Sequence, residues 1–147
     1  MPLDTQHLQT TVRALEASVT LYRRAFEERQ AIQQEVYRLA IVKGFELTQE
    51  VCFKLLRRKL RDFGHVARGL EATPIKDLLR VGAQRGLLTL DEVERWFAYR
   101  DNRNDTAHDY GDGFAHETLS LIPDFIRDVR AFEKRLHPES PDSGTPN

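Results

Sequence analysis

Apolar residues recur at helical spacing along most of this chain. Near the N-terminus, Leu8, Val12, Leu15, Val19 and Tyr22 lie three or four positions apart and form one apolar stripe. Such a stripe is typical of a helix that packs one face against a core. The pattern therefore predicts a first amphipathic helix from about Asp4 to Phe26.

The next segment, from about Gln30 to Phe63, is apolar around most of its girth and not along one face only. A helix of this kind is buried on several sides. We therefore expect a central helix, or one that also meets a partner, with Gly44 marking a close helix crossing. The apolar positions are Ile32, Val36, Leu39, Ala40, Ile41, Val42, Phe45, Leu47, Val51, Cys52, Leu55, Leu56 and Leu60.

The second half of the chain also has the spacing of helices, and no segment predicts a strand. Thr89 and Glu92 have the spacing of a capping box, which marks a helix start. Pro123 is expected to kink or split the last helix, because proline removes a backbone hydrogen bond. The expected elements are a loop over His65–Ala72 and helices over Ile75–Gln84, Leu90–Tyr110 and Phe114–Leu136.

These elements predict an all-α fold, an up-and-down bundle of about five helices. We expect residues 1–136 to form one helical domain. The tail, residues 137–147, is rich in Pro, Ser and Gly and has no apolar anchor, so we expect it to be disordered.

Composition limits the classes of function. The 147 residues are 40% hydrophobic, which suits one globular domain, and the formal net charge is −1. A near-neutral chain is not a general polyanion binder, so any nucleic-acid contact must come from a local patch. The single cysteine, Cys52, excludes an intrachain disulfide and is expected in the core. With no signal-peptide pattern and no membrane-length apolar run, a cytoplasmic location is expected.

One local patch is a basic run near the end of the second helix. It has two interpretations: the solvated face of that helix, which is the commoner case, or a path that guides RNA toward a cleft. The run consists of Lys54, Arg57, Arg58, Lys59 and Arg61.

The stretch RNDTAHDY, residues 103–110, carries the candidate chemistry. Arg103 offers a planar fork of donors that suits phosphate oxygens, and His108 exchanges protons near neutral pH. Together these groups suffice for metal-independent RNA cleavage through attack of the ribose 2′-OH. Asn104 or Asp101, which share the helix face of His108, are candidates for holding its ring.

Arg103 and His108 do not share a face of an ideal helix. They are five positions apart, which corresponds to about 140° around the axis. A cleft formed with a symmetric second copy would solve this, because each copy supplies one of each residue. The alternative is a polar surface turn in which Asp105 and Asp109 pair with nearby arginines. The aspartates miss the spacing of a calcium loop, so no metal site is predicted.

Several segments together resemble the HEPN superfamily. The signature there is Arg-x4-6-His with a polar residue after the arginine, followed by x-Tyr; this chain has Arg103, Asn104, His108 and Tyr110. More closely, the chain resembles the HepT-type toxin branch, whose members are also known as nucleotidyltransferase substrate-binding proteins. The segments that carry the resemblance are GFELTQEVCFKLLRRKL, TPIKDLLRVGAQRGLL and YRDNRNDTAHDYGDGFAHETLSLIPDF.

The resemblance implies a helical bundle that dimerises, with the signature residues in a cleft between protomers. Arg103 and His108 would be the metal-independent ribonuclease pair, supported by Asn104, with Arg100 as a further phosphate contact. Tyr110 would be the residue to which a partner minimal nucleotidyltransferase, the antitoxin of a type VII-like toxin–antitoxin pair, attaches AMP. No cofactor is implied.

Two other functions stay open on the sequence alone. The protein could be a non-catalytic subunit that presents substrate to a nucleotidyltransferase, or a plain helical dimerisation domain. Neither the RNA that is cut nor the stoichiometry with a partner follows from the residues.

Overall fold

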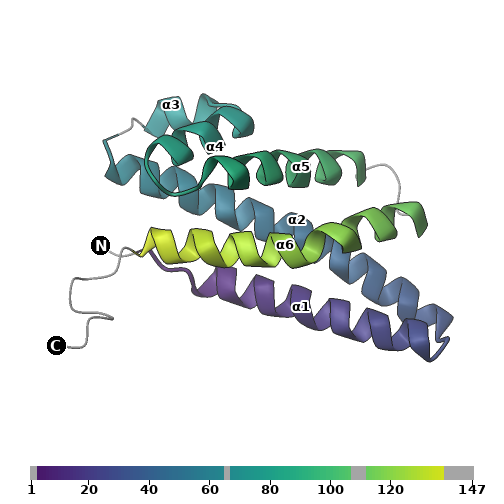
Figure 1. The fold of residues 1–147 in the computed structure, drawn as a ribbon. Coiled ribbons are helices and arrows are strands. Elements are labelled where there is room, and N and C mark those ends of the chain that lie inside the picture. Colours follow the sequence, from purple (N-terminus) through teal and green to yellow (C-terminus); the bar gives the residue numbers. More distant parts are fainter. Residues whose placement is uncertain (1–2, 65–66, 107–111, 138–147) are drawn as a thin grey trace.

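The computed structural model describes residues 3–64, 67–106 and 112–137, and every element within them is a helix. α2 runs through the middle of the molecule, with α1 antiparallel along one side and α4, α5 and α6 packed along the rest (Figure 1). The all-α bundle predicted from the sequence is therefore confirmed. The elements are α1 (Gln6–Glu27), α2 (Ala31–Asp62), α3 (Ala67–Ala72), α4 (Ile75–Gln84), α5 (Leu90–Thr106) and α6 (Asp112–Leu136).

The prediction of a loop over residues 65–72 was wrong for residues 67–72, which form α3, while residues 65 and 66 lie outside the described residues. Leu70 is buried in the core and fixes this short helix. The hydroxyl of Thr73 donates to the carbonyl of Gly69 at 2.6 Å near its end. With only six residues and a central Gly69, α3 is too short for its apolar spacing to be recognised.

The boundaries near the candidate chemistry also differ from those expected. α6 begins at Asp112, two residues before the predicted start, and it runs through Pro123 without a break. α5 is described as far as Thr106, so its expected continuation to Tyr110 lies outside the described residues. The same holds for the expected disorder of residues 138–147, whereas His137 makes a 3.1 Å contact with the hydroxyl of Thr5.

α2 is the central helix that its broad apolar surface predicts. The apolar side chains near its start, however, are not buried by other described residues. Ile32, Val36 and Leu39 are exposed, the first of them by 73%. Farther along, Phe45, Cys52 and Leu60 are buried. A Cβ atom placed on Gly44 would lie 3.3 Å from Cδ1 of Leu15, which confirms a close crossing of α1 and α2 at this glycine. No described helix is long and apolar enough to cross a membrane.

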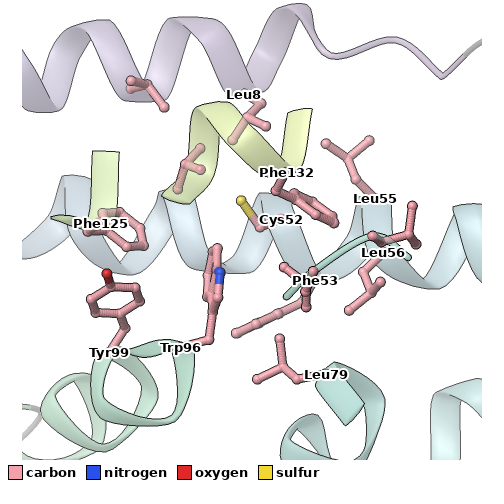
Figure 2. Packing of buried hydrophobic residues seen from close by; sticks show 14 of the residues in the cluster. Leu8, Cys52, Phe53, Leu55, Leu56, Leu79, Trp96, Tyr99, Phe125 and Phe132 are labelled. Atoms are coloured by element: carbon pink, nitrogen blue, oxygen red, sulfur yellow. The ribbon is translucent and has the colours of Figure 1, made fainter. Parts of the chain in front are cut away.

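Aromatic rings fill the centre of the core where α2, α5 and α6 meet (Figure 2). Phe125 packs edge-on against Phe45, Tyr99 and Trp96, with ring centroids 4.7, 5.0 and 5.6 Å apart. Edge-to-face pairs of this kind are favoured by the ring quadrupoles. Cys52 lies in the same core, and burial raises the pKa of its thiol. Trp96 is thus a packing residue of this core.

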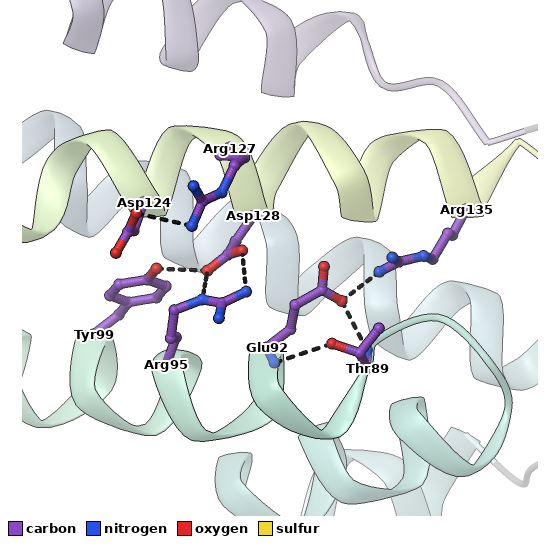
Figure 3. A network of polar contacts seen from close by, with 8 residues as sticks. All are labelled: Thr89, Glu92, Arg95, Tyr99, Asp124, Arg127, Asp128 and Arg135. Atoms are coloured by element: carbon purple, nitrogen blue, oxygen red, sulfur yellow. Dashed lines mark hydrogen bonds and ion pairs between the residues drawn. The ribbon is translucent and has the colours of Figure 1, made fainter.

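One buried carboxylate joins α5 to α6 (Figure 3). Asp128 accepts two hydrogen bonds from the guanidinium of Arg95, at 2.8 and 2.9 Å, and one from the hydroxyl of Tyr99 at 2.6 Å. Burial raises the pKa of Tyr99, and the bond to Asp128 raises it further, so the phenol stays protonated. A buried charge is stable only when its hydrogen-bonding capacity is met in this way.

The start of α5 is fixed by the predicted capping box. The backbone N–H of Thr89 donates to Glu92 at 2.7 Å, and the N–H of Glu92 donates to the hydroxyl of Thr89 at 3.1 Å. Arg135 of α6 also contacts the Glu92 carboxylate. α5 is therefore held to α6 by polar contacts along its first half.

We expect Asp128→Ala to lower the free energy of unfolding by about 3 kcal/mol, because it leaves Arg95 and Tyr99 without their buried partner. Urea denaturation followed by circular dichroism measures this. The matched control is Asp124→Ala on the same helix, which breaks an exposed 2.8 Å pair with Arg127 and should cost under about 1 kcal/mol. Equal losses in the two variants would contradict the role given to Asp128.

Candidate functional site

Arg103 is the residue of the signature that the structure describes in full. It lies in the last turn of α5, and its side chain is 21% exposed. One guanidinium nitrogen lies 2.7 Å from Glu50 and 3.5 Å from Glu46, both on α2. Glu50 and Glu46 therefore hold Arg103 toward α2. The alternative in which Asp105 and Asp109 pair with nearby arginines rests on side chains outside the described residues.

Arg100 lies one turn before Arg103 and also faces α2. Its guanidinium stands over the ring of Phe53, 5.9 Å from the centroid. Burial lowers the pKa of Arg100, and repulsion from Arg103 and then from Arg57 lowers it further, against the opposing effect of Glu50. Arginine remains charged at neutral pH despite such shifts. Arg103 on α5 and Arg57 on α2 thus both lie within electrostatic reach of Arg100.

Asp101 was one of two residues expected to orient the histidine ring. The structure places its exposed carboxylate 3.0 Å from the amine of Lys76 on α4. Phe97, on the same side of α5, is covered by Lys76 and Arg80 at 5.3 and 5.0 Å from its ring. Two cations of α4 therefore cover the ring of Phe97, and one of them also pairs with Asp101.

Sequence reasoning missed Asn102, which is 9% exposed at the end of α5. Its side-chain oxygen accepts a hydrogen bond from the hydroxyl of Thr118 on α6 at 3.1 Å. It also missed Glu50 and Glu46. Neither glutamate has a local pattern that links it to Arg103, since 53 positions separate Glu50 from it.

The other predicted site residues are not placed by the structure. His108 and Tyr110 lie outside the described residues, as does the side chain of Asn104. The structure therefore describes only the part of the predicted site that contains the arginines. In this part, Arg103 and Arg100 of α5 face Glu50 and Arg57 of α2.

Comparison with known proteins assigns the family. The family model described as nucleotidyltransferase substrate binding protein like matches residues 4–138, nearly the whole chain. The chain belongs to this nucleotidyltransferase substrate-binding family. The resemblance read from the sequence is thereby confirmed at the level of the family.

One protein of similar sequence and one solved structure agree with this family assignment. A Haemophilus influenzae protein named probable ribonuclease HepT is 30% identical over 101 residues, which cover 69% of this chain and 68% of that protein. The solved structure of HI0074 from Haemophilus influenzae, described as the fold of a substrate-binding domain of a nucleotidyltransferase, matches with a TM-score of 0.80. It is 27% identical and the match covers 90% of this chain and 98% of that one.

A second solved structure in the same fold comes from Thermus thermophilus. Its TM-score is 0.68 at 25% identity, and the match covers 88% of this chain and 98% of that one. The helical arrangement of Figure 1 is therefore shared by the proteins from Haemophilus influenzae and Thermus thermophilus.

We expect the Arg103–Glu50 pair to contribute only about 0.5–1 kcal/mol to stability, because the carboxylate is 44% exposed. A double-mutant cycle with Arg103→Ala and Glu50→Ala, measured by urea denaturation, gives the coupling. A small coupling means that this pair contributes little to the stability of the bundle. A coupling above about 2 kcal/mol would instead mean that the pair is important for the stability of the fold.

Proposed function

We propose that this protein is a metal-independent endoribonuclease of the HepT type, the toxin of a type VII-like toxin–antitoxin pair. One observation carries the proposal: Arg103 and His108 have the signature spacing in a chain 30% identical to a probable ribonuclease HepT. The half-buried guanidinium of Arg103 adds support. It is held in place by Glu50 while it remains partly accessible.

In the proposed reaction, an imidazole removes the proton of a ribose 2′-OH, and that oxygen attacks the adjacent phosphorus. The bond from phosphorus to the 5′ oxygen breaks, and a second imidazole donates a proton to that oxygen. Arg103 stabilises the negative charge that builds on the phosphate oxygens. The products are a 2′,3′-cyclic phosphate end and a 5′-hydroxyl end, and no metal or cofactor enters the balance.

This reaction uses a base and an acid, and one chain has a single histidine in the signature. We therefore include a homodimer in the proposal, in which each protomer supplies one His108 to a shared cleft. Asn104 would orient the imidazole ring, and Arg100 would contact a phosphate next to the one that is cut. Arg100 is well placed for this because it lies one turn from Arg103 on the same side of α5.

The partner in this proposal is a minimal nucleotidyltransferase that acts as antitoxin. The hydroxyl of Tyr110 attacks the α-phosphate of ATP, an AMP ester forms on the tyrosine, and pyrophosphate leaves. The added negative charge and bulk would repel and occlude RNA beside Arg103.

A second candidate function rests on the family description itself. Both the family model and HI0074 are described by substrate binding for a nucleotidyltransferase, and not by catalysis. In that case the chain is a non-catalytic subunit that binds RNA or another substrate and presents it to its partner.

We expect the purified wild-type protein to cut cellular RNA in EDTA and to leave 2′,3′-cyclic phosphate ends. Arg103→Ala or His108→Ala should reduce the rate about 100-fold or more, the usual effect of losing a general acid–base group or a charge-stabilising donor. End-group analysis by mass spectrometry measures the products. His116→Ala, which alters an exposed histidine of α6, is the matched control and should cut at the wild-type rate.

Two results decide between the candidate functions. Full activity in both signature variants would end the ribonuclease proposal for this site. No cleavage by the wild type, with Tyr110 shown to be unmodified, would favour the binding subunit.

We expect incubation with the partner nucleotidyltransferase and ATP to add one adenylyl group to Tyr110 and to abolish RNA cleavage. Intact-mass and peptide mass spectrometry detect the adduct. Tyr110→Phe should remain unmodified, while Tyr37→Phe on α2 should be modified as the wild type is. Modification at any other residue would remove Tyr110 from the proposal.

A further inference from the structure

The structure divides the basic run of α2 into two parts. Lys59 turns toward Phe63, with its amine 5.9 Å from the ring centroid. The other four cations line a hollow of about 490 Å³ between the start of α1, α2 and α3. They are Lys54, Arg57, Arg58 and Arg61.

Helical spacing explains why these cations share one hollow. Glu50, Lys54, Arg57 or Arg58, and Arg61 recur every three or four positions on one face of α2. From Glu50 to Arg61 this face extends about 16 Å along the helix. The charges therefore form a line and not a single point.

These cations lack the ion pairs that others in the molecule make. Among described residues, no carboxylate lies within 4.0 Å of the charged nitrogens of Lys54, Arg57, Arg58 or Arg61. By contrast, Lys76, Arg80 and Arg127 each pair with an aspartate. The buried Nε of Arg57 has no hydrogen-bond partner within the described chain. A buried donor in this state is costly, and an anion is a partner that suits a guanidinium N–H.

Carboxylates also line the hollow, and two of the three have partners of their own. Glu50 binds Arg103 at 2.7 Å, and Asp4 accepts a hydrogen bond from the backbone N–H of Gln6 at 2.9 Å. Glu71 is the third. The surplus of unpaired charge in the hollow is therefore positive.

The hollow is continuous with the candidate site. Glu50 belongs to both, since it lines the hollow and holds Arg103. Arg57 lines the hollow and lies close enough to Arg100 to repel it. A line of cations thus leads from Arg103 through Arg100 and Arg57 to Arg61.

We propose that this hollow binds the backbone phosphates of a single RNA strand beside the bond that is cut at Arg103. The proposal rests on the proposed function and extends it to the substrate strand. Among the described residues, no Phe, Tyr or Trp lines the hollow, and the ring of His7 is its one aromatic group. The lining is dominated by cations and therefore favours phosphates over bases. A strand offers several phosphates along this line of charges, whereas a free nucleotide offers them at one point, and such phosphate contacts carry no sequence preference.

The test is binding of a fluorescent 2′-O-methyl oligouridine, which cannot be cut, measured by anisotropy over a range of salt concentrations. We compare wild type with Arg58→Gln/Arg61→Gln, which replaces two exposed arginines of the hollow. The matched control is Arg23→Gln/Arg24→Gln, which removes the same charge from exposed positions of α1. Circular dichroism establishes that all variants are folded.

We expect the Arg58→Gln/Arg61→Gln variant to bind about tenfold or more weakly, since charge-assisted hydrogen bonds are lost. Its plot of log affinity against log salt should be less steep by about 1.4, at about 0.7 per phosphate contact of a single strand. The control should keep the wild-type affinity and slope. Equal losses in both double variants would overturn the proposal, because they would reflect net charge alone.

Two further arms separate this inference from its alternatives. ATP is offered as a probe in the same assay, and a preference for ATP that disappears in Arg58→Gln/Arg61→Gln would overturn the assignment to a strand. RNA cleavage is measured in parallel. If Arg58→Gln/Arg61→Gln loses binding but the wild type does not cut RNA, the strand site is upheld and the ribonuclease proposal ends. If the wild type cuts RNA and the double variant binds the oligonucleotide as tightly as the wild type, the strand site is overturned and the ribonuclease proposal stands.

Discussion

The Asp128 carboxylate determines where α5 lies. It is 1% exposed, and it accepts from Arg95 and Tyr99, two residues four positions apart on one face of α5. A single buried charge therefore fixes both the distance and the rotation of α5 relative to α6, provided all three hydrogen bonds stay in place. The rotation matters because Arg100 and Arg103 follow on the same helix. If α5 were rotated about its axis, these two arginines would no longer face α2.

The second half of α5 is held by weaker contacts than the first. Beyond Tyr99, the contacts include the buried Asn102–Thr118 hydrogen bond, the Arg100–Phe53 contact and ion pairs of Asp101 with Lys76 and of Arg103 with Glu50 and Glu46. The ion pairs are partly exposed and contribute little to stability. The aromatic core and Asp128 thus contribute most to the stability of the bundle, and the signature end of α5 contributes less. Under the proposed function, Glu50 would keep the Arg103 fork ordered before RNA binds, which would reduce the entropy lost on binding.

Much of the fold could be predicted because its signals are local. The capping box at Thr89 and Glu92 and the stripe of α1 depend on residues three or four positions apart, and both are confirmed. Periodicity shows that a face is apolar but not whether anything covers it. Ile32 and Val36 continue the spacing of α2, yet they are exposed. The helix α3 was missed because one turn and a half carries too little pattern.

The candidate site could be predicted only in part, for the same reason. Residue type and spacing pick out Arg103, the family resemblance adds Arg100, and the structure places both against α2. What they face depends on contacts between distant segments. Glu50 and Glu46 carry no local sign of their role, and the basic run divides into a hollow and a separate Lys59–Phe63 contact only once α1 and α3 are in position.

The aromatic core contains the chain's single tryptophan, Trp96, which is 1% exposed. It lies two turns before Arg103 on α5, with the rings of Tyr99 and Phe132 edge-on at 5.5 and 6.4 Å. An indole in such apolar surroundings emits at shorter wavelength than one in water. The protein therefore carries an intrinsic optical probe on the helix that bears the signature, and its emission reports directly whether α5 is seated in the bundle.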